Sequence, residues 1–375
     1  MITKKIDKIR ILVFADTEAA HTRRWTNWFS NNGLNVHVLS FNKVVASGYN
    51  NVNIKILWKP KLKTKFIIRI IKAFVIVCRS VYAFLKIRPH VIHGHSCGSY
   101  AWITLFFPKT PIVITPWGTD ILIDVKKSIL NMILTKKSLN HADLVTTDAE
   151  HMRPELERLI GKSNKILYLP FGTDINVFKP IQNRLNSKFI NIISTRTLNK
   201  VHNVDLLIEA LPSLLKTDSR LRFTIVGSGS EFEFLFSRCS DLKILDFVTF
   251  TGNVSELEMA KLLSSSDFYV STSPFDAGLA ASTAEAMAVG LPIVHPDTAD
   301  NRYWVGIEGA EFFPPYNLNG FIKAVTQMVQ RKTEWSDMGK RNRQIIIKSN
   351  NLDTNMNIML EHYILLAKVK NYKLP

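Results

Sequence analysis

The sequence predicts an α/β protein of two doubly wound domains, each a parallel β-sheet with helices on both faces. Three observations predict this class. The chain of 375 residues is long enough for two hydrophobic cores. Short apolar runs alternate with longer segments of helical periodicity along the chain. The alternation restarts after residues 170–180, so we expect the domain junction near 172–185.

Apolar runs predict the strands of both domains. Those of the first domain are Ile9–Ala15, Val36–Phe41, Val52–Trp58, Val91–His95, Ile112–Thr115, Leu144–Thr147 and Ile166–Leu169. Those of the second domain are Ile190–Ser194, Arg222–Val226, Val248–Thr251, Phe268–Ser271 and Ile293–His295. We expect the first domain at residues 1–175, the second at 185–352, and a C-terminal helix in 353–375 that packs back toward the first domain. Such sheets bind ligands at the carboxyl ends of their strands, here in a cleft between the domains.

The formal net charge of +17 predicts an anionic partner: nucleic acid, a membrane surface or a phosphorylated substrate. Residues 59–88 contain nine lysines and arginines and no acid. One helical stripe of this segment carries Lys61, Lys65, Arg69, Lys72, Arg79 and Lys86. The segment is either a helix lying on an anionic bilayer or a helix packed on the sheet with a solvated basic face. The absence of acids slightly favours the membrane, and residues 126–137 are a second, weaker candidate.

Several other function classes lack support. No RNP, KH or zinc-finger signature accompanies the charge, so we expect no nucleic acid partner. The three cysteines are far apart, which predicts a reducing compartment and no disulfide or metal framework. No Asp-x-Asp pair occurs, which favours a scheme without a metal or other cofactor. The first apolar run ends at Ala15 and acids follow at once, so it predicts a strand and not a signal peptide.

Residues 273–294 are the most informative segment. Gly278 opens a run of small residues, which predicts a helix start with free backbone N–H groups at Gly278, Leu279 and Ala280. Such groups favour an anion such as a diphosphate. Glu285 follows two helical turns later, where its carboxylate can accept hydrogen bonds from sugar hydroxyls. The segment therefore predicts a nucleotide-sugar site.

Other loops of the second domain support this site. Arg196 and Lys200 follow its first strand, and two cations there can clamp a diphosphate with no competing carboxylate nearby. Gly227 and Gly229 follow the next strand, and Val254 lies in the loop after the third. The glycine pair alone is a weak signal. The convergence of four loops at one sheet edge is a stronger one.

Polar and aromatic residues also follow the strands of the first domain. His21 and Arg24 follow the first strand, and His21 either faces the cleft or is a cap or surface residue. His95 ends a strand two residues after His93, but no third ligand is nearby, so a metal site is not expected. Trp117 lies in a loop that ends at Asp120, whose carboxylate either receives a substrate hydroxyl or caps a turn.

Together these residues resemble the GT4-type retaining glycosyltransferases, which have the GT-B fold of two Rossmann-like domains facing across a cleft. The resemblance extends over nearly the whole chain. Within the family, the sequence is similar to a branch that makes bacterial surface polysaccharides. Its markers are His21-Thr-Arg-Arg-Trp25, His93-Gly-His95, Trp117-Gly-Thr-Asp120, Pro170-Phe-Gly-Thr-Asp174, Phe178-Lys-Pro180, Ser194-Thr-Arg196, Val226-Gly-Ser-Gly229, Phe250-Thr-Gly252 and Glu285-Ala-Met-Ala288.

The resemblance implies roles for these residues. Glu285 would hold the nucleotide ribose, and Arg196 with Lys200 would bind the diphosphate. Backbone amides at 278–280 would face the phosphate or sugar, and residues 250–254 would contact the base. On the acceptor side would be His21, Arg24, His95, Trp117 and Asp120, with His95 and Asp120 near the reacting hydroxyl.

The chain also departs from the family pattern. The family usually carries a carboxylate eight residues before the position of Glu285, and this residue here is Ala277. Asp276 lies one residue earlier. Either a one-residue bulge lets Asp276 contact the donor sugar, or that contact is lost.

The resemblance implies a metal-independent, retaining hexosyltransferase for lipopolysaccharide, O-antigen or capsule synthesis. A UDP- or GDP-linked sugar would be the donor, and a lipid-linked or polysaccharide hydroxyl the acceptor. We expect a cytoplasmic protein, peripheral on the inner face of the cytoplasmic membrane and docked through residues 59–88. The alternatives are a catalytically weak nucleotide-sugar-binding partner subunit and a GT-B sugar-nucleotide epimerase.

Overall fold

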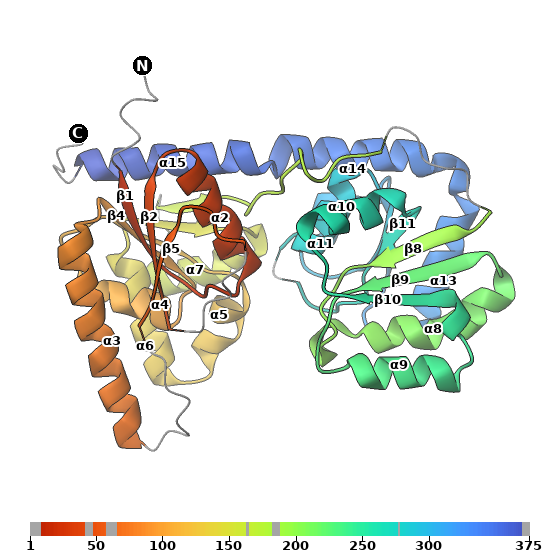
Figure 1. Ribbon diagram of the computed structural model, residues 1–375, viewed down its shortest axis with the longest axis horizontal. Coiled ribbons are helices and arrows are strands. Elements are labelled where there is room, and N and C mark those ends of the chain that lie inside the picture. The colour runs from red at the N-terminus through yellow and green to blue at the C-terminus, as the bar shows by residue number, and fades with distance from the viewer. Residues whose placement is uncertain are drawn as a thin grey trace. The chain divides into compact units, whose positions relative to one another are not determined.

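The computed structural model describes residues 9–41, 48–57, 66–162, 165–181, 188–276 and 278–369, and only the backbone of residues 66–70. It contains two compact units (Figure 1). The first comprises Met1–Phe171 and Asp353–Pro375, and the second comprises Gly172–Leu352. Each is a parallel sheet with helices packed against it.

The first unit is built on seven parallel strands in the order β3-β2-β1-β4-β5-β6-β7. The strands are β1 (Arg10–Phe14), β2 (Asn35–Ser40), β3 (Asn53–Ile56), β4 (Val91–His95), β5 (Ile112–Thr115), β6 (Leu144–Thr147) and β7 (Ile166–Tyr168). The helices are α2 (Ala20–Asn31), α3 (Phe66–Ile87), α4 (Ser99–Trp102), α5 (Thr119–Leu122), α6 (Ile129–His141) and α7 (Arg153–Ile160), with short 3-10 turns η1 (Ile103–Phe106), η2 (Asp124–Lys126) and η3 (Glu150–Met152). The central strands β4, β5 and β6 are buried along their whole length, as expected for a parallel sheet covered on both faces.

The second unit is built on six parallel strands in the order β10-β9-β8-β11-β12-β13. The strands are β8 (Ile190–Ser194), β9 (Leu221–Val226), β10 (Val248–Gly252), β11 (Phe268–Val270), β12 (Ile293–Pro296) and β13 (Ala310–Phe313). The helices are α8 (Val204–Thr217), α9 (Phe232–Asp241), α10 (Glu256–Ser265), α11 (Ala281–Ala288), α12 (Asn301–Val305), α13 (Leu318–Gln330) and α14 (Trp335–Ser349), with the 3-10 turns η4 (Lys200–His202), η5 (Leu245–Phe247) and η6 (Lys332–Glu334). Apolar faces of α8, α9 and α13 pack on this sheet to form the core.

The last helix, α15 (Leu352–Val369), belongs to the first unit from Asp353 onward. Trp28 donates a hydrogen bond from Nε1 to Asp353 Oδ1 at 2.7 Å. Asn355 donates from Nδ2 to the carbonyl of Pro170 at 2.9 Å. The chain therefore leaves the first unit after Phe171 and contributes a helix to it again at its end.

The predicted α/β class is confirmed. All the predicted strands are present, and their ends differ from the prediction by at most two residues. The prediction missed β13, whose four residues, Ala-Glu-Phe-Phe, include a charge and are half exposed in the middle. This pattern is weak because β13 lies at the edge of the sheet, where it pairs with β12.

The structure describes only part of residues 59–88, the segment rich in lysine and arginine. Lys61 and Lys65 lie outside the described residues, and so does the side chain of Arg69. One face of α3 packs into the unit through Ile76, Ser80, Ala83 and Ile87, which are buried at helical spacing. No helix within the described residues is long and apolar enough to cross a membrane.

Candidate functional site

Each sheet has a point at which the strand order reverses. In the second unit this point lies between β8 and β11, and in the first it lies between β1 and β4. The loops that leave two such strands diverge, which opens a crevice at the carboxyl edge of a parallel sheet. Arg196 follows β8 and Asp276 follows β11, whereas His21 follows β1 and His95 ends β4. Predicted residues of both domains thus lie at these two switch points.

Arg196 is buried at the switch point of the second unit, with 8% of its surface exposed. Its Nη2 donates to Asp276 Oδ1 at 2.5 Å, and its Nη1 donates to Ser282 Oγ at 3.1 Å. Its Nε is buried and has no hydrogen-bond partner among the described residues. The guanidinium therefore keeps one unused donor at the position where an anion was predicted.

Asp276 corrects the prediction that no carboxylate competes for Arg196. The two residues are 80 positions apart, and both are nearly fully buried. Burial raises the pKa of Asp276, and the charge of Arg196 opposes that shift. Burial acts to lower the pKa of Arg196, but the charge of Asp276 raises it overall. The Oδ2 atom of Asp276 has no hydrogen-bond partner in the described structure.

Two histidines that sequence reasoning missed surround this ion pair. His202 Nδ1 lies 3.1 Å from Arg196 Nη2, which donates to it, and 3.3 Å from Ser273 Oγ. His295 Nε2 lies 4.0 Å from Asp276 Oδ2 and 3.1 Å from Thr283 Oγ1. Burial and the charge of Arg196 lower the pKa of His202 to about 4 and that of His295 to about 3. Both rings are therefore neutral near pH 7 and add no charge to the pair.

The helix that was predicted to begin near Gly278 begins at Ala281. Ala280 is its N-cap residue, with φ −59° and ψ 140°, so its extended backbone delays the helix. Gly278 and Leu279 precede this cap, and Ala277 lies outside the described residues. Glu285 is buried inside the helix with 7% of its surface exposed. Because Ser282, a partner of Arg196, lies in the first turn, the start of α11 and the guanidinium are close together.

The glycine loops have a packing role that needs no ligand. A Cβ on Gly227 would lie 2.7 Å from the carbonyl oxygen of Arg196, and one on Gly229 would lie 2.2 Å from that of Leu198. Both glycines therefore let the loops after β8 and β9 pack against each other. Val254 is half-buried after β10, and Lys200 is exposed at the start of η4.

The switch point of the first unit contains neutral rings. His93 Nδ1 lies 2.5 Å from Tyr363 Oη, and its Nε2 lies 2.6 Å from Thr115 Oγ1. His95 Nδ1 lies 3.3 Å from Thr22 Oγ1. Burial lowers the pKa of His93 to about 3. Burial, with His93 and His21 nearby, lowers the pKa of His95 well below its ordinary value.

Trp117 joins these histidines to the loop after β1. The centroids of the Trp117 and His21 rings are 4.0 Å apart, and those of Trp117 and His95 are 5.5 Å apart. Burial and the charge of Arg24 lower the pKa of His21 to about 4. The indole N–H of Trp117 is buried and has no hydrogen-bond partner in the described part of the chain. His21 is thus part of this group of rings and not an isolated surface residue.

Asp120 holds the loops after β4 and β5 together. Its Oδ2 accepts a hydrogen bond from the backbone N–H of Cys97 at 2.7 Å, and its Oδ1 accepts one from Trp117 N at 3.0 Å. Burial raises the pKa of Asp120, and these N–H groups oppose the shift. The geometry resembles the turn-capping alternative, although each carboxylate oxygen can accept a further hydrogen bond.

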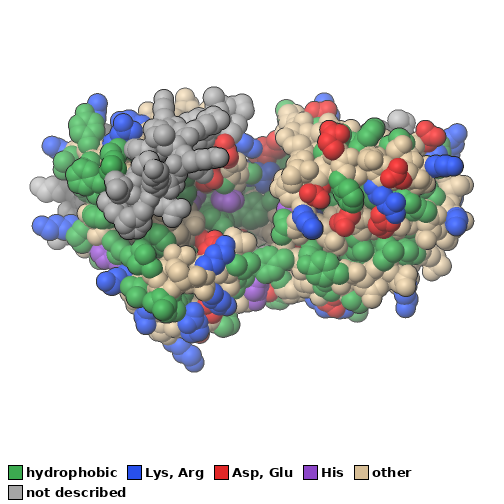
Figure 2. Space-filling model, turned by 90° about the horizontal axis from the view of Figure 1, so that it is seen from below, with side chains coloured by type: hydrophobic (Ala, Val, Ile, Leu, Met, Phe, Trp, Pro, Cys, Tyr) green, Lys and Arg blue, Asp and Glu red, His purple; other side chains and the backbone are tan. Residues whose placement is uncertain are grey.

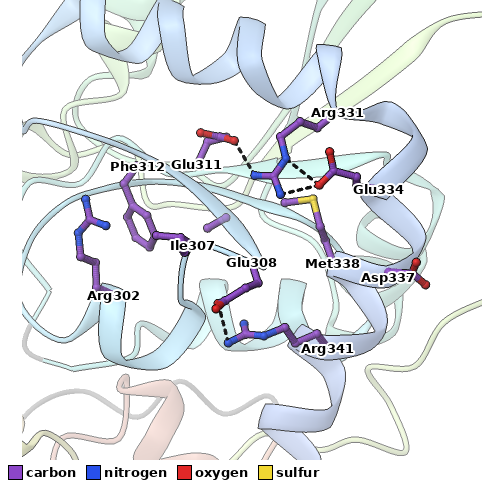
Figure 3. A pocket seen from close by; sticks show the side chains of 11 residues that line it. Arg302, Ile307, Glu308, Glu311, Phe312, Arg331, Glu334, Asp337, Met338 and Arg341 are labelled. Carbon is purple, nitrogen blue, oxygen red and sulfur yellow. Dashed lines mark hydrogen bonds and ion pairs between the residues drawn. The ribbon is translucent and has the colours of Figure 1, made fainter.

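A cavity of about 770 Å³ in the second unit contains none of the predicted site residues (Figure 3). It is lined by β13, α14 and neighbouring loops. Its arginines are already paired: Arg331 binds Glu311 and Glu334, and Arg341 binds Glu308 (Figure 3). Arg302, which also lines the cavity, binds Asp297. The arginines of the cavity are thus neutralised by carboxylates, as Arg196 is by Asp276.

Comparison with protein families accounts for most of the chain. Residues 10–149 match the family described as "Glycosyl transferase 4-like", and residues 178–345 match "Glycosyl transferases group 1". A curated relative is the GDP-mannose-dependent alpha-(1-6)-phosphatidylinositol monomannoside mannosyltransferase of Mycobacterium tuberculosis. It is 27% identical over 167 residues, which cover 40% of this chain and 43% of that protein. The chain thus matches less than half of that relative's length.

Solved structures show the same fold. Sucrose-phosphate synthase from Thermosynechococcus elongatus superposes with a TM-score of 0.81 at 15% identity, covering 96% of this chain and 100% of that one. Anabaena HepE in complex with UDP-glucose superposes with a TM-score of 0.77 at 14% identity, covering 95% and 100%. The two family matches and the two parallel-sheet units lead to one conclusion. The chain belongs to the GT4-type glycosyltransferases with the GT-B fold.

Proposed function

We propose that this chain transfers a hexose from a nucleotide diphosphate sugar to a hydroxyl of a lipid-linked or polysaccharide acceptor in cell-surface glycan synthesis. The observation that carries the proposal is Arg196, a buried guanidinium with an unused Nε donor at a sheet switch point. The mannosyltransferase relative is named for a GDP-mannose donor and a phosphatidylinositol-linked acceptor, and HepE was solved with UDP-glucose. These names support a UDP- or GDP-linked donor and a lipid-linked acceptor.

The donor would bind the second unit. Arg196 would donate to the diphosphate, assisted by Lys200 and by the backbone N–H groups at the start of α11. Glu285 would accept hydrogen bonds from the ribose, and residues 250–254 would contact the base. Asp276 would exchange its contact with Arg196 for one with the donor sugar.

The acceptor would bind the first unit. Trp117 offers an unused N–H donor beside the neutral rings of His21 and His95. A neutral ring and an N–H group suit an uncharged ligand with many hydroxyls. Arg24 and Asp120 would complete this side, with Asp120 near the reacting hydroxyl.

The transfer would break the bond between the anomeric carbon and the diphosphate and form one to the acceptor oxygen on the same face of the sugar. The departing phosphate would take the acceptor proton, so no separate carboxylate pair is required. Arg196, Lys200 and the start of α11 would stabilise the charge that develops on the leaving diphosphate. We propose that this reaction retains configuration and needs no metal.

Replacement of Arg196 tests the proposal. Arg196→Ala should lower kcat for transfer by about 10²-fold or more, because it removes a donor to the leaving group. Arg302→Ala is a matched control, since Arg302 is an exposed arginine of the same unit. Turnover of Arg196→Ala equal to that of Arg302→Ala would contradict the assignment.

A second candidate is a nucleotide-sugar-binding partner subunit that transfers little or no sugar. The ion pair of Arg196 with Asp276 favours it, because the charge meant for the diphosphate is already neutralised. Binding of UDP- or GDP-sugars without transfer or donor hydrolysis would support this candidate over the enzyme.

We further propose that the protein works at the inner face of the cytoplasmic membrane, docked through residues 59–88. The basic residues of this segment would each contribute about 1 kcal/mol near an anionic surface. Replacing Lys61, Lys65, Arg69 and Lys72 by Gln should reduce sedimentation with anionic liposomes. Unchanged sedimentation would leave only a helix with a solvated basic face.

A further inference from the structure

The first unit contains an apolar groove of about 530 Å³, which we name the α3–α6 groove. Residues of α3, α4, η1 and α6 form its walls, together with Phe41 at the end of β2. All its lining side chains are apolar except Lys72 and Ser99. Trp102 lies in it and donates from Nε1 to Thr135 Oγ1 of α6 at 3.3 Å. The volume is within the range of small-molecule sites, about 300–1,000 Å³.

Exposed apolar side chains continue from this groove along the same elements. Ten large ones lie between residues 71 and 133: four on α3, one on η1, one just before η2 and four on α6. They are Ile71, Phe74, Tyr82, Leu85, Phe106, Ile123, Ile129, Leu130, Met132 and Ile133. Figure 2 shows hydrophobic side chains beside Lys and Arg on the first unit, in the left half of the view. Apolar exposure on this scale is typical of an interaction surface.

Lys72 is the charged residue in the lining of the groove. No aspartate or glutamate occurs between Glu18 and Asp120, a stretch that contains fourteen lysines and arginines. Lys72 lines the groove itself, and Lys136 and Lys137 are exposed on α6. An apolar groove with a lysine in its lining is complementary to a molecule with a hydrocarbon chain and an anionic head.

We propose that the α3–α6 groove binds one hydrocarbon chain of an anionic lipid, whose head group contacts Lys72. The inference deepens the membrane placement of the proposed function and does not depend on sugar transfer. Each methylene that enters the groove strengthens binding about fourfold, so a chain of several carbons anchors the protein more firmly than charge alone. Binding through the groove therefore requires that a lipid chain enters the protein, whereas adsorption on a charged surface does not.

Quenching of Trp102 fluorescence tests the proposal on the full chain. Phosphatidylglycerol vesicles with brominated acyl chains should quench part of the protein's tryptophan emission, because bromine quenches only at short range. Trp102→Phe should remove most of this quenching, while the control Trp335→Phe, a buried tryptophan of the second unit, should retain it. Equal quenching in Trp102→Phe and wild type would overturn the proposal.

A groove-filling variant separates the chain from the charge. Ala73→Phe should weaken binding to phosphatidylglycerol vesicles about tenfold, without changing net charge, because the groove admits about two methylenes fewer. Leu257→Phe, at an exposed position of the second unit, is its control. Unchanged vesicle binding in Ala73→Phe, or equal binding to phosphatidylcholine and phosphatidylglycerol, would overturn the proposal.

Two further outcomes are informative. If Phe106→Ser converts a dimer in solution to a monomer, a second copy of the chain occupies the groove and the proposal fails. Transfer of sugar to a soluble hydroxyl acceptor should be the same in Ala73→Phe and wild type. If only the lipid proposal is wrong, wild type and Ala73→Phe both still transfer sugar. If the proposed function is wrong, neither protein transfers sugar.

Discussion

The two units have different chemistry at equivalent points of their sheets. At the β8/β11 switch point of the second unit, a buried ion pair joins Arg196 to Asp276. At the β1/β4 switch point of the first, the buried groups are neutral rings, including His93 and His95. A buried guanidinium suits a multiply charged anion, and neutral rings suit a ligand with uncharged hydroxyls. Under the proposed function, this difference would suit the second unit to a charged donor and the first unit to an uncharged acceptor.

The largest effect should come from breaking the ion pair of the second unit. Asp276→Ala leaves Arg196 buried without an ionised partner, which should cost about 3–5 kcal/mol in the free energy of unfolding. Urea unfolding of the ligand-free protein measures this cost. Asp297→Ala is the control, because the Asp297–Arg302 pair is exposed and should contribute about 0–1 kcal/mol. Inorganic diphosphate should restore more stability to Asp276→Ala than to wild type, and equal stabilisation would contradict the role of Arg196.

A smaller effect should follow from removing a neutral partner in the first unit. Tyr363→Phe deletes the hydroxyl that lies 2.5 Å from His93 Nδ1 and leaves a buried ring nitrogen unsatisfied. The expected cost is about 1–3 kcal/mol in the free energy of unfolding. Tyr82→Phe is the matched control, since Tyr82 is 66% exposed and should change stability by less than about 0.5 kcal/mol. If both variants have the unfolding free energy of wild type, the hydrogen bond between Tyr363 and His93 does not stabilise this unit.

Lowering the pH should gradually reduce the free energy of unfolding, because the buried histidines of the first unit are neutral in the folded protein. The pKa of His21 is lowered to about 4, whereas an unfolded histidine titrates near 6.5. Between these values the unfolded chain binds a proton that the folded chain does not, so stability falls as pH falls through this window. Each pH unit should cost about 1.4 kcal/mol for this histidine. His21→Gln should reduce the pH slope of the unfolding free energy by one proton between pH 4 and 6.5, and an unchanged slope would show that His21 is not held neutral.

The sequence predicts the fold well because strands and helices depend on local patterns. Apolar runs mark every strand except β13, which is short, charged and half exposed at the sheet edge. The start of α11 was placed three residues early, because a run of small residues does not reveal the extended backbone at Ala280.

The candidate site is harder to predict, because it depends on which strands are neighbours. Arg196 and Asp276 meet only because β8 lies beside β11, although 80 residues separate them in the chain. His202 and His295 gave a weak signal, since a single histidine after or within a strand is often structural. His202 lies two residues after Lys200 in the same loop, and this position is the one sequence feature that places it near the predicted site. The packing roles of Gly227 and Gly229 likewise depend on contacts between loops.

The most direct test is the equilibrium binding of UDP and GDP to the wild-type protein and to Arg196→Ala, measured by calorimetry. We predict that one of the nucleotides binds the wild type, and that Arg196→Ala weakens this binding by about 10-fold to 100-fold, because a charge-assisted hydrogen bond to phosphate is lost. The corresponding nucleoside, which lacks phosphate, should bind both proteins equally. Equal affinity of the diphosphate for wild type and Arg196→Ala would contradict the claim that Arg196 marks a diphosphate site.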